Sequence, residues 1–334
     1  MNIAVLLGGI STERNVSIAS GKAVGQALSE RGHTISFIDP SLGHNCIIQA
    51  NDLISVANET VAQEYLNLSP RVLLECVQSP AFDTIDIAFS LLHGKYGEDG
   101  IMQALLEARG VRYVGSKVMA SALAMDKVRT KLILSAAGVQ SPEWSVLYPQ
   151  QFNDYERIEH IMNDLGGTIV IKPNTNGSSV GLSIVDNDID HAIKAVQLAS
   201  QYDSTILIER YIAGREVTVA VLGDQAFPVI EIVPEQGWYD YQNKYTKGNT
   251  QYYCPADITN DERDFLQNLA VTAHRIVGCT AYSRIDFRLD EDGVPWCLEV
   301  NTIPGFTETS LVPMAAQSIG ISYGELCERI IALS

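Results

Sequence analysis

The sequence predicts an α/β protein whose first part is a doubly wound domain. Two observations favour this fold class. Short apolar runs alternate with helix-like segments from the N-terminus onward, as they do in parallel sheets covered by helices. The chain is also 334 residues long, which is too long for one compact core and suits two or three domains.

The N-terminal elements follow from apolar runs that stop at glycine, proline or polar residues. Ile3–Leu7 predicts a buried strand that ends at Gly8-Gly9. A helix should follow, with Ser11 or Thr12 as its cap. The next elements are strands at Thr34–Ile38 and Ile85–Leu92, a helix at Gly100–Arg109 and a short strand at Val111–Val114. Residues 41–80 show no regular pattern.

The middle of the chain combines a long helix with a glycine- and serine-rich loop. One helix is expected over Ser116–Ala137, and a hairpin is expected from strands at Thr168–Lys172 and Leu182–Val185. Between these strands, the backbone N–H groups of residues 177–181 are free to wrap phosphate oxygens, with the Lys172 ammonium beside them. The spacing is neither Walker A nor GxGxxG, and an ordinary turn is the alternative.

The later part of the chain contains an aperiodic, tyrosine-rich segment. The regular elements around it are helices at Ile189–Ser200, Asp261–Val277 and near Tyr323–Leu333, and strands at Thr205–Tyr211, Glu216–Leu222 and Phe227–Val233. Residues 235–255 show no clean period, which is typical of a functional lid. Within it we expect Lys244 and Tyr245 to touch a substrate, and surface packing of the tyrosines is the alternative.

The segment Ser283–Gly305 predicts two strands joined by an acidic turn at 290–293. With Leu289 opposite Val294, the facing pairs are Arg284 with Glu299 and Asp286 with Cys297. Alternation then divides the side chains between two faces. One face carries Arg284, Asp286, Glu299 and Asn301, and the other carries Ile285, Phe287, Trp296, Leu298 and Val300.

The polar face of this hairpin has the oxygen ligands that Mg²⁺ prefers. Two carboxylates and an amide gather there, and Mg²⁺ takes substrate phosphates as further ligands. The hairpin therefore favours a nucleotide-dependent reaction. The alternative is a polar sheet face with one Arg–Glu cross-strand pair.

Two positions near the N-terminal strands have both a structural and a functional interpretation. Glu13 lies in the first turn of the expected helix, either as a helix-favouring acid or as a group that binds a substrate amine. His93 follows the carboxyl end of a strand, where open α/β sheets bind ligands. A structural histidine is the alternative.

Composition excludes several classes of protein. The net charge of −17 argues against nucleic acid as a partner, because no basic surplus is present to neutralise phosphates. No apolar run reaches the ~20 residues of a membrane helix, so we expect no membrane contact. The N-terminus opens with a strand-like run and has no basic region followed by an apolar stretch, so we expect no signal peptide. Six dispersed cysteines without a CxxC pair argue against a zinc site and favour reduced thiols in the cytoplasm.

Taken together, these segments resemble the D-alanine–D-alanine ligases of the ATP-grasp superfamily. The matching segments cover almost the whole chain in order, and several are long and specific. They are LLGGISTERNVS, LLHGKYGEDG, YVGSKVMASALAMDKVRTK, VIKPNTNGSSVG, IERYIAGREVTVAVLG, WYDYQNKYTKGNTQYYCPA and SRIDFRLDEDGVPWCLEVNTIPGFTETSLVP.

The resemblance implies an architecture and an activity. It implies an N-terminal Rossmann-like substrate domain at 1–115 and a two-domain ATP-grasp fold, with a central subdomain at 116–213 and a C-terminal subdomain at 214–334. It implies a cytoplasmic homodimer that makes D-alanyl-D-alanine for peptidoglycan precursors from ATP and two D-alanines, through D-alanyl phosphate. It also implies two Mg²⁺ ions, with Mn²⁺ as a substitute.

The resemblance also implies roles for individual residues. Those on the nucleotide are Lys127 and Lys172 at the phosphates, Ser178 and Ser179 in the closing loop, Glu209 with the Tyr211 and Ile212 backbone at adenine, Glu216 at the ribose, and Lys244. Those on the metal ions are Asp286, Glu299 and Asn301. Those on the substrates are Glu13 at the first ammonium, His93 near the first D-alanine, Arg284 and Gly305 at the oxyanion, Ser310 and Leu311 at the second D-alanine, and Tyr245 with Glu13 and Ser178 between lid and site.

Departures from the family pattern are modest. Asn15 follows Arg14 where many relatives carry Glu, and the 41–80 region is longer than in compact members. Tyr245 favours an amine over a hydroxyl nucleophile, because the lid of D-alanyl-D-lactate enzymes differs there. The alternatives are a D-alanine–D-lactate or other dipeptide ligase of the superfamily, and a nucleotide-binding regulator without catalysis. The intact set of site residues argues against the regulator.

Overall fold

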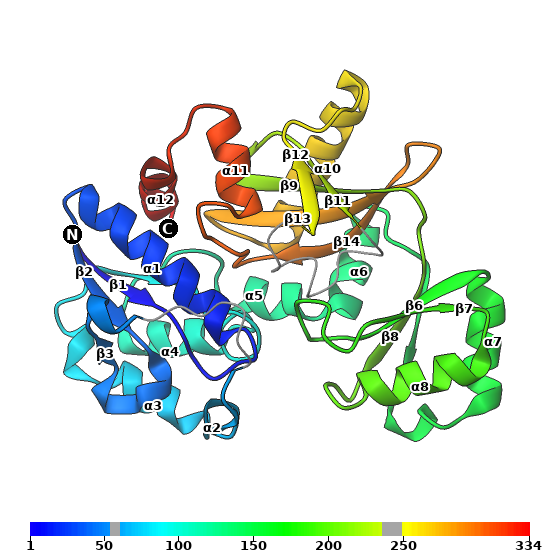
Figure 1. Ribbon diagram of the computed structural model, residues 1–334, viewed down its shortest axis with the longest axis horizontal. Coiled ribbons are helices and arrows are strands. Elements are labelled where there is room, and N and C mark those ends of the chain that lie inside the picture. Colours follow the sequence, from blue (N-terminus) through cyan, green and yellow to red (C-terminus); the bar gives the residue numbers. More distant parts are fainter. Residues whose placement is uncertain (54–60, 236–248) are drawn as a thin grey trace.

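The computed structural model describes residues 1–53, 61–235 and 249–334. These residues form three sheets with helices packed on them, which confirms the α/β fold class (Figure 1). The sheet of β1–β4 lies at the left of the view, the largest sheet at the upper centre, and the sheet of β5–β8 at the right. In the described residues, no helix combines the length and the apolar character that crossing a bilayer requires.

The N-terminal sheet has the order β3-β2-β1-β4 and is parallel except at its β3 edge. Its strands are β1 (Asn2–Leu6), β2 (Thr34–Ile38), β3 (Ile47–Ile48) and β4 (Ile87–Ser90). Helix α1 (Arg14–Glu30) begins after Glu13, and the expected caps Ser11 and Thr12 were wrong. The Ser11 hydroxyl instead accepts the Glu13 N–H. The expected strand at Val111–Val114 is only a single bridge, between Ala88 and Tyr113.

The irregular region that follows β2 contains short elements that no apolar period predicted. They are η1 (Pro40–Asn45), η2 (Ala50–Asp52), α2 (Gln63–Leu66), α3 (Arg71–Val77) and η3 (Pro80–Phe82). Helix α4 (Ile101–Arg109) then confirms the expected helix and ends at Gly110, whose φ of 76° is the left-handed conformation of a helix end.

The long helix expected over Ser116–Ala137 is two helices, α5 (Val118–Met125) and α6 (Lys127–Ala136). Asp126 breaks it, because its backbone is extended and its carboxylate accepts the N–H of Arg129 as the cap of α6. The same carboxylate accepts the side-chain amide of Asn174 at 2.9 Å. The break therefore ties the start of α6 to the loop after β6.

The second sheet is antiparallel, with the order β5-β8-β6-β7. Its strands are β5 (Trp144–Leu147), β6 (Thr168–Pro173), β7 (Ser183–Asp186) and β8 (Ile206–Arg210). The expected hairpin around the glycine- and serine-rich loop is confirmed as β6 and β7. Helices α7 (Tyr155–Leu165) and α8 (Ile189–Ala199) pack on this sheet around a shared apolar core, and η4 (Pro149–Gln151) precedes them.

The largest sheet is antiparallel, with the order β12-β11-β9-β13-β14 and β10 beside β9. Its strands are β9 (Arg215–Leu222), β10 (Gln225–Ala226), β11 (Ile230–Pro234), β12 (Thr250–Tyr253), β13 (Tyr282–Leu289) and β14 (Pro295–Asn301). Strand β12 lies in the segment that was expected to be aperiodic. The helices that accompany the sheet are α10 (Asn260–Val277), α11 (Leu311–Ser318) and α12 (Tyr323–Ala332).

The register of the β13–β14 hairpin differs from the expected one. Leu289 pairs with Pro295, and an extra residue, Leu298, then shifts the register between Phe287 and Asp286. The resulting pairs are Phe287 with Cys297, Asp286 with Glu299 and Arg284 with Asn301. The pairing of Leu289 with Pro295 is a first shift by one residue, which would move the side chains of β14 to the opposite face. The bulge at Leu298 is a second shift by one residue, and it returns Glu299 and Asn301 to the face of Asp286.

The bulge also exchanges which apolar residues of β14 enter the core. Cys297 is fully buried beside Ile285 and Phe287, whereas Leu298 lines the cleft described below. The expectation that Trp296 and Leu298 share a face with Ile285 and Phe287 was therefore wrong. Trp296 is half-buried and donates its indole N–H to Asp290 at 2.8 Å.

One apolar core joins the N-terminal sheet to the C-terminal part of the chain. Phe306 lies at its centre, with ring centroids 6.1 Å from Phe89, 5.6 Å from Tyr282 and 5.8 Å from Tyr323. Helix α12 packs beside α1, so the last helix of the chain contacts the first (Figure 1).

Candidate active site

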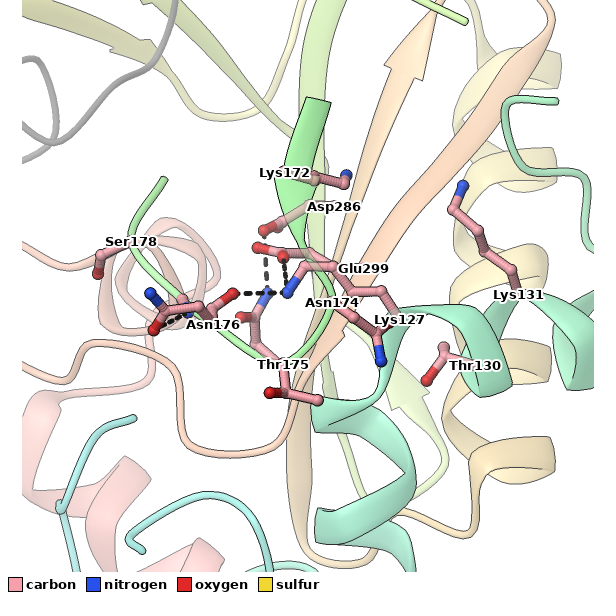
Figure 2. A network of polar contacts seen from close by, with 12 residues as sticks. Lys127, Thr130, Lys131, Lys172, Asn174, Thr175, Asn176, Ser178, Asp286 and Glu299 are labelled. Atoms are coloured by element: carbon pink, nitrogen blue, oxygen red, sulfur yellow. Dashed lines mark hydrogen bonds and ion pairs between the residues drawn. The ribbon is translucent and has the colours of Figure 1, made fainter. Parts of the chain in front are cut away.

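A cleft lies between the β5–β8 sheet and the β13–β14 hairpin. It encloses about 920 Å³, counting the part open to solvent. The expected site residues that line it are Lys127, Lys172, Ser179, Glu209, Tyr211, Ile212, Glu216, Asp286 and Glu299. Figure 2 shows side chains from α6, β6, the loop after β6 and the hairpin meeting at this place. Lys244 and Tyr245 lie outside the described residues.

Lys127, the first residue of α6, crosses from the helix to the loop and to the hairpin. Its Nζ donates to the Asn176 carbonyl oxygen at 2.7 Å and lies 3.6 Å from Glu299 Oε2 (Figure 2). The side chain is only 9% exposed. Burial lowers the pKa of the Lys127 ammonium, and the Glu299 carboxylate opposes that effect. The lysine thus links three segments that are distant in sequence.

Glu209 on β8 lies between two ammonium groups. Lys172 Nζ contacts its Oε1, and Lys131 Nζ lies 2.9 Å from its Oε2. Burial by itself would raise the pKa of Glu209, but the two lysines hold it below its ordinary value. Lys131 was not among the expected site residues. Its spacing of four from Lys127, which places both on one face of a helix, is the signal that could have identified it.

Asp286 on β13 has its carboxylate held from three sides. Arg284 donates Nε at 2.8 Å and Nη2 at 2.7 Å, and Asn301 donates its amide at 3.0 Å. The Thr218 hydroxyl on the neighbouring strand donates at 2.6 Å. Thr218 was also missed, because nothing local shows that β9 pairs with β13.

The donor set of the hairpin fits a hard cation. Asp286 lies directly opposite Glu299, and the oxygen of the Asn301 amide can join their carboxylates. Across residues 1–53, 61–235 and 249–334, no group of three or more His, Cys, Asp and Glu side chains is placed for a metal. The fit to Mg²⁺ therefore depends on the amide as the third ligand.

The loop after β6 reaches Glu13, the residue before α1. The Ser178 hydroxyl donates to Glu13 Oε1, and a Cβ at Gly177 would lie 3.3 Å from Glu13 Oε2. Ser178 and Ser179 have φ values of 51° and 59°, a conformation that costs energy for residues other than glycine. Glu13 is 7% exposed. Two residues 165 positions apart in the sequence are thus in contact.

The remaining expected residues lie near the carboxyl end of β14 and the end of β4. Ser310 immediately precedes α11, which begins at Leu311, and its hydroxyl oxygen lies 3.6 Å from the place of a Cβ on Gly305. His93 is buried, and burial lowers the pKa of its ring while the Glu13 carboxylate opposes this. Within the described part of the chain, His93 Nε2 has no hydrogen-bond partner.

Comparisons with known proteins cover nearly the whole chain. Two family profiles match it, described as D-ala D-ala ligase N-terminus over residues 2–116 and D-ala D-ala ligase C-terminus over residues 133–332. The D-alanine–D-alanine ligase of Syntrophotalea carbinolica is 40% identical over 330 residues, which cover 99% of this chain and 95% of that protein.

Solved structures agree with this similarity. The D-alanine–D-alanine ligase of Bacillus anthracis complexed with ATP has a TM-score of 0.76 at 29% identity, over 100% of this chain and 96% of that one. The VanG D-Ala:D-Ser ligase of Enterococcus faecalis has a TM-score of 0.78 at 31% identity, over 99% and 98%. The shared fold is therefore common to enzymes with different second substrates.

Proposed function

The chain belongs to the D-alanine–D-alanine ligase family, and from this we infer that it is an ATP-dependent ligase that joins two D-alanines. The product is D-alanyl-D-alanine, formed through D-alanyl phosphate with release of ADP and phosphate. A carboxylate is a poor electrophile, so the first D-alanine must be phosphorylated before an amine can attack it. The observation that carries this function is the cleft in which two lysines face two carboxylates beside the Glu13–Ser178 contact.

The nucleotide is proposed to bind along the cleft. The ammonium groups of Lys127 and Lys172 would hold its phosphates, and the backbone N–H groups around Ser178 and Ser179 would wrap them. The Glu209 carboxylate, with the backbone of Tyr211 and Ile212, would receive adenine. Glu216 would receive the ribose, and we assign Lys244 to the nucleotide from the family resemblance. The proposal is supported by the residues of this set that line one cleft, which are Lys127, Lys172, Ser179, Glu209, Tyr211, Ile212 and Glu216.

Asp286, Glu299 and Asn301 are proposed to hold two Mg²⁺ ions, with Mn²⁺ as a substitute. When bound, such ions neutralise charge on the transferring phosphoryl group. The two facing carboxylates and the amide support this assignment. The Lys127 ammonium, 3.6 Å from Glu299 Oε2, would help to position the phosphates beside these ligands.

The amino-acid substrates are proposed to lie where the loop after β6 meets the N-terminal domain. Glu13 would hold the ammonium of the first D-alanine, beside His93, while Tyr245 and Ser178 would connect the lid to it. When the second amine attacks, the Arg284 guanidinium and the N–H groups near Gly305 would stabilise the oxyanion. Ser310 and Leu311 would receive the carboxylate of the second D-alanine. The contact of Glu13 with Ser178 supports this placement.

We also propose that the enzyme supplies peptidoglycan precursors in the cytoplasm as a homodimer. A compartment that supplies ATP is required by the reaction. All six cysteines are free thiols, which fits a reducing compartment. The homodimer and the peptidoglycan role rest on the family resemblance.

The test is phosphate release from ATP by the purified protein with D-alanine, L-alanine, D-lactate or D-serine as partner substrate. We expect turnover when D-alanine is the only amino acid present, and we expect D-alanine to be the preferred second substrate. D-serine belongs in the series because the Enterococcus faecalis D-Ala:D-Ser ligase is as similar in fold as the ligases of D-alanine. Preferential use of D-lactate or D-serine would replace the assigned second substrate. Absence of turnover with every amino acid would favour a nucleotide-binding regulator.

A further inference from the structure

Lys131 is a buried cation that the mechanism above does not use. Its side chain is 1% exposed, and its Nζ lies 2.9 Å from Glu209 Oε2 and 3.5 Å from the Pro142 carbonyl oxygen. Lys172 Nζ contacts Oε1 of the same glutamate. Both oxygens of one buried carboxylate are therefore paired with ammonium groups.

The two lysines differ in their access to the cleft. Lys172 and Glu209 line it, whereas Lys131 is not among the residues that do. Figure 2 shows Lys131 on α6, one helical turn after Lys127. A phosphate that enters the cleft can thus pair with Lys172 but not with Lys131. Because one carboxylate lies between two cations, one positive charge is in excess and attracts an anion.

We propose that Lys131 is a positioning residue for the nucleotide, which keeps the Glu209 carboxylate ionised and in place while Lys172 turns from it to the phosphates. The inference rests on the proposed function, because it assumes that the cleft binds ATP. A buried carboxylate that loses its partners is strongly disfavoured and takes up a proton. A protonated Glu209 would accept a weaker hydrogen bond from the amino group of adenine.

The first test measures ATP and GTP binding to the full chain by calorimetry. GTP has a ring carbonyl oxygen where ATP has an amino group, so an ionised Glu209 disfavours it. Lys131→Met should weaken ATP binding by about tenfold or more and narrow the preference for ATP over GTP, since a buried charge loses its partner. Lys194→Met, which removes an exposed lysine of α8, should change neither. Unchanged affinity and preference in Lys131→Met would overturn the inference.

A second comparison stays informative even when Lys131→Met alone does not fold. It sets Glu209→Gln against the double variant Glu209→Gln/Lys131→Met, in which no buried carboxylate is left unpaired. The two variants should differ by less than about twofold in ATP affinity and in the ratio of ATP affinity to GTP affinity, because Lys131 acts through Glu209. A large further loss in the double variant would show an independent role and overturn the proposal. Failure of the unsubstituted protein to bind ATP would instead contradict the proposed function.

Discussion

At the scale of single residues, the carboxylates of the cleft are each held by a cation. Glu299 lies beside Lys127, Asp286 accepts two hydrogen bonds from Arg284, and Glu209 lies between two lysines. Buried charges are tolerated when they are paired, and removing one partner leaves the other uncompensated. Replacing one member of such a pair should therefore cost more than simple loss of a contact would.

Replacing Glu299 should stop turnover. Glu299→Ala removes a carboxylate that is proposed to hold metal, so phosphate release should fall by about 1000-fold or more, because several kcal/mol of transition-state stabilisation is lost. Glu291→Ala, at an exposed position in the turn of the same hairpin, is the matched control and should keep its activity. Near-normal turnover in Glu299→Ala would refute the metal assignment.

Replacing Arg284 should separate catalysis from nucleotide binding. Arg284→Ala should lower kcat by about 100-fold to 1000-fold, as loss of an oxyanion donor does, while ATP affinity changes far less. Steady-state kinetics and ATP calorimetry on the same preparation measure both quantities. The oxyanion role fails when ATP binding is largely lost but the bound complex turns over at the normal rate.

At the scale of elements, the caps and bulges decide where the side chains of the site point. The break at Asp126 places Lys127 at the start of a helix, facing the loop after β6. The extra residue Leu298 turns Glu299 toward the cleft, opposite Asp286. Both features therefore set the geometry of the site.

The cap of α6 should matter for both stability and nucleotide affinity. Asp126→Ala removes the N-cap, at a cost of about 1 kcal/mol, and also the contact with Asn174. We expect a lower Tm and a raised KM for ATP. Asp188→Ala removes the N-cap of α8, so it should lower Tm without affecting KM. Equal KM values in the two variants would show that the link from α6 to the loop is unimportant for ATP.

The elements also show how far sequence patterns reach. Alternation of apolar residues correctly predicted the β13–β14 hairpin and the residues of its polar face. It missed the bulge, because Cys297 and Leu298 are both apolar and either one can enter a core. It likewise missed the break in the Ala-rich helix, because Asp126 can also occur inside a helix. Here hydrogen bonds from the Arg129 N–H and the Asn174 amide stabilise an extended backbone at Asp126.

At the scale of the whole molecule, the chain brings distant segments to one place. Glu13 contacts Ser178, and Phe306 packs against Phe89, which couples the N-terminal sheet to the segment after β14. Because Gly305 precedes Phe306, the proposed oxyanion site is anchored in this shared core. Positions from both ends of the chain therefore depend on the same packing.

The global stability should fall in acid partly through His274. Burial lowers the pKa of this histidine from 6.5 to about 4. The unfolded chain thus takes up a proton at higher pH than the folded chain, so stability is fully present above pH 6.5 and is lost as pH falls toward 4. The loss between pH 7 and pH 5 is about 2 kcal/mol for this residue.

Urea unfolding at pH 7 and pH 5 measures this effect. The Ser283 hydroxyl lies 2.7 Å from His274 Nδ1. In His274→Gln the side chain cannot titrate, but its amide can still form a hydrogen bond with this hydroxyl. The variant should lose less stability between the two pH values than the unsubstituted protein. His160→Gln, in which the replaced side chain is 64% exposed, should leave the difference unchanged. Identical losses in all three proteins would contradict the assignment.

The amino-acid sequence was enough for the α/β class, for most strands and helices, and for the family, because apolar periodicity and long motifs are local properties of the chain. The lowered pKa of Glu209, its ion pair with Lys131, the register beyond Leu298 and the approach of Glu13 to Ser178 came from the folded structure. Each of these depends on partners that are distant along the chain, and a local pattern carries no information about which distant group will be within hydrogen-bonding distance.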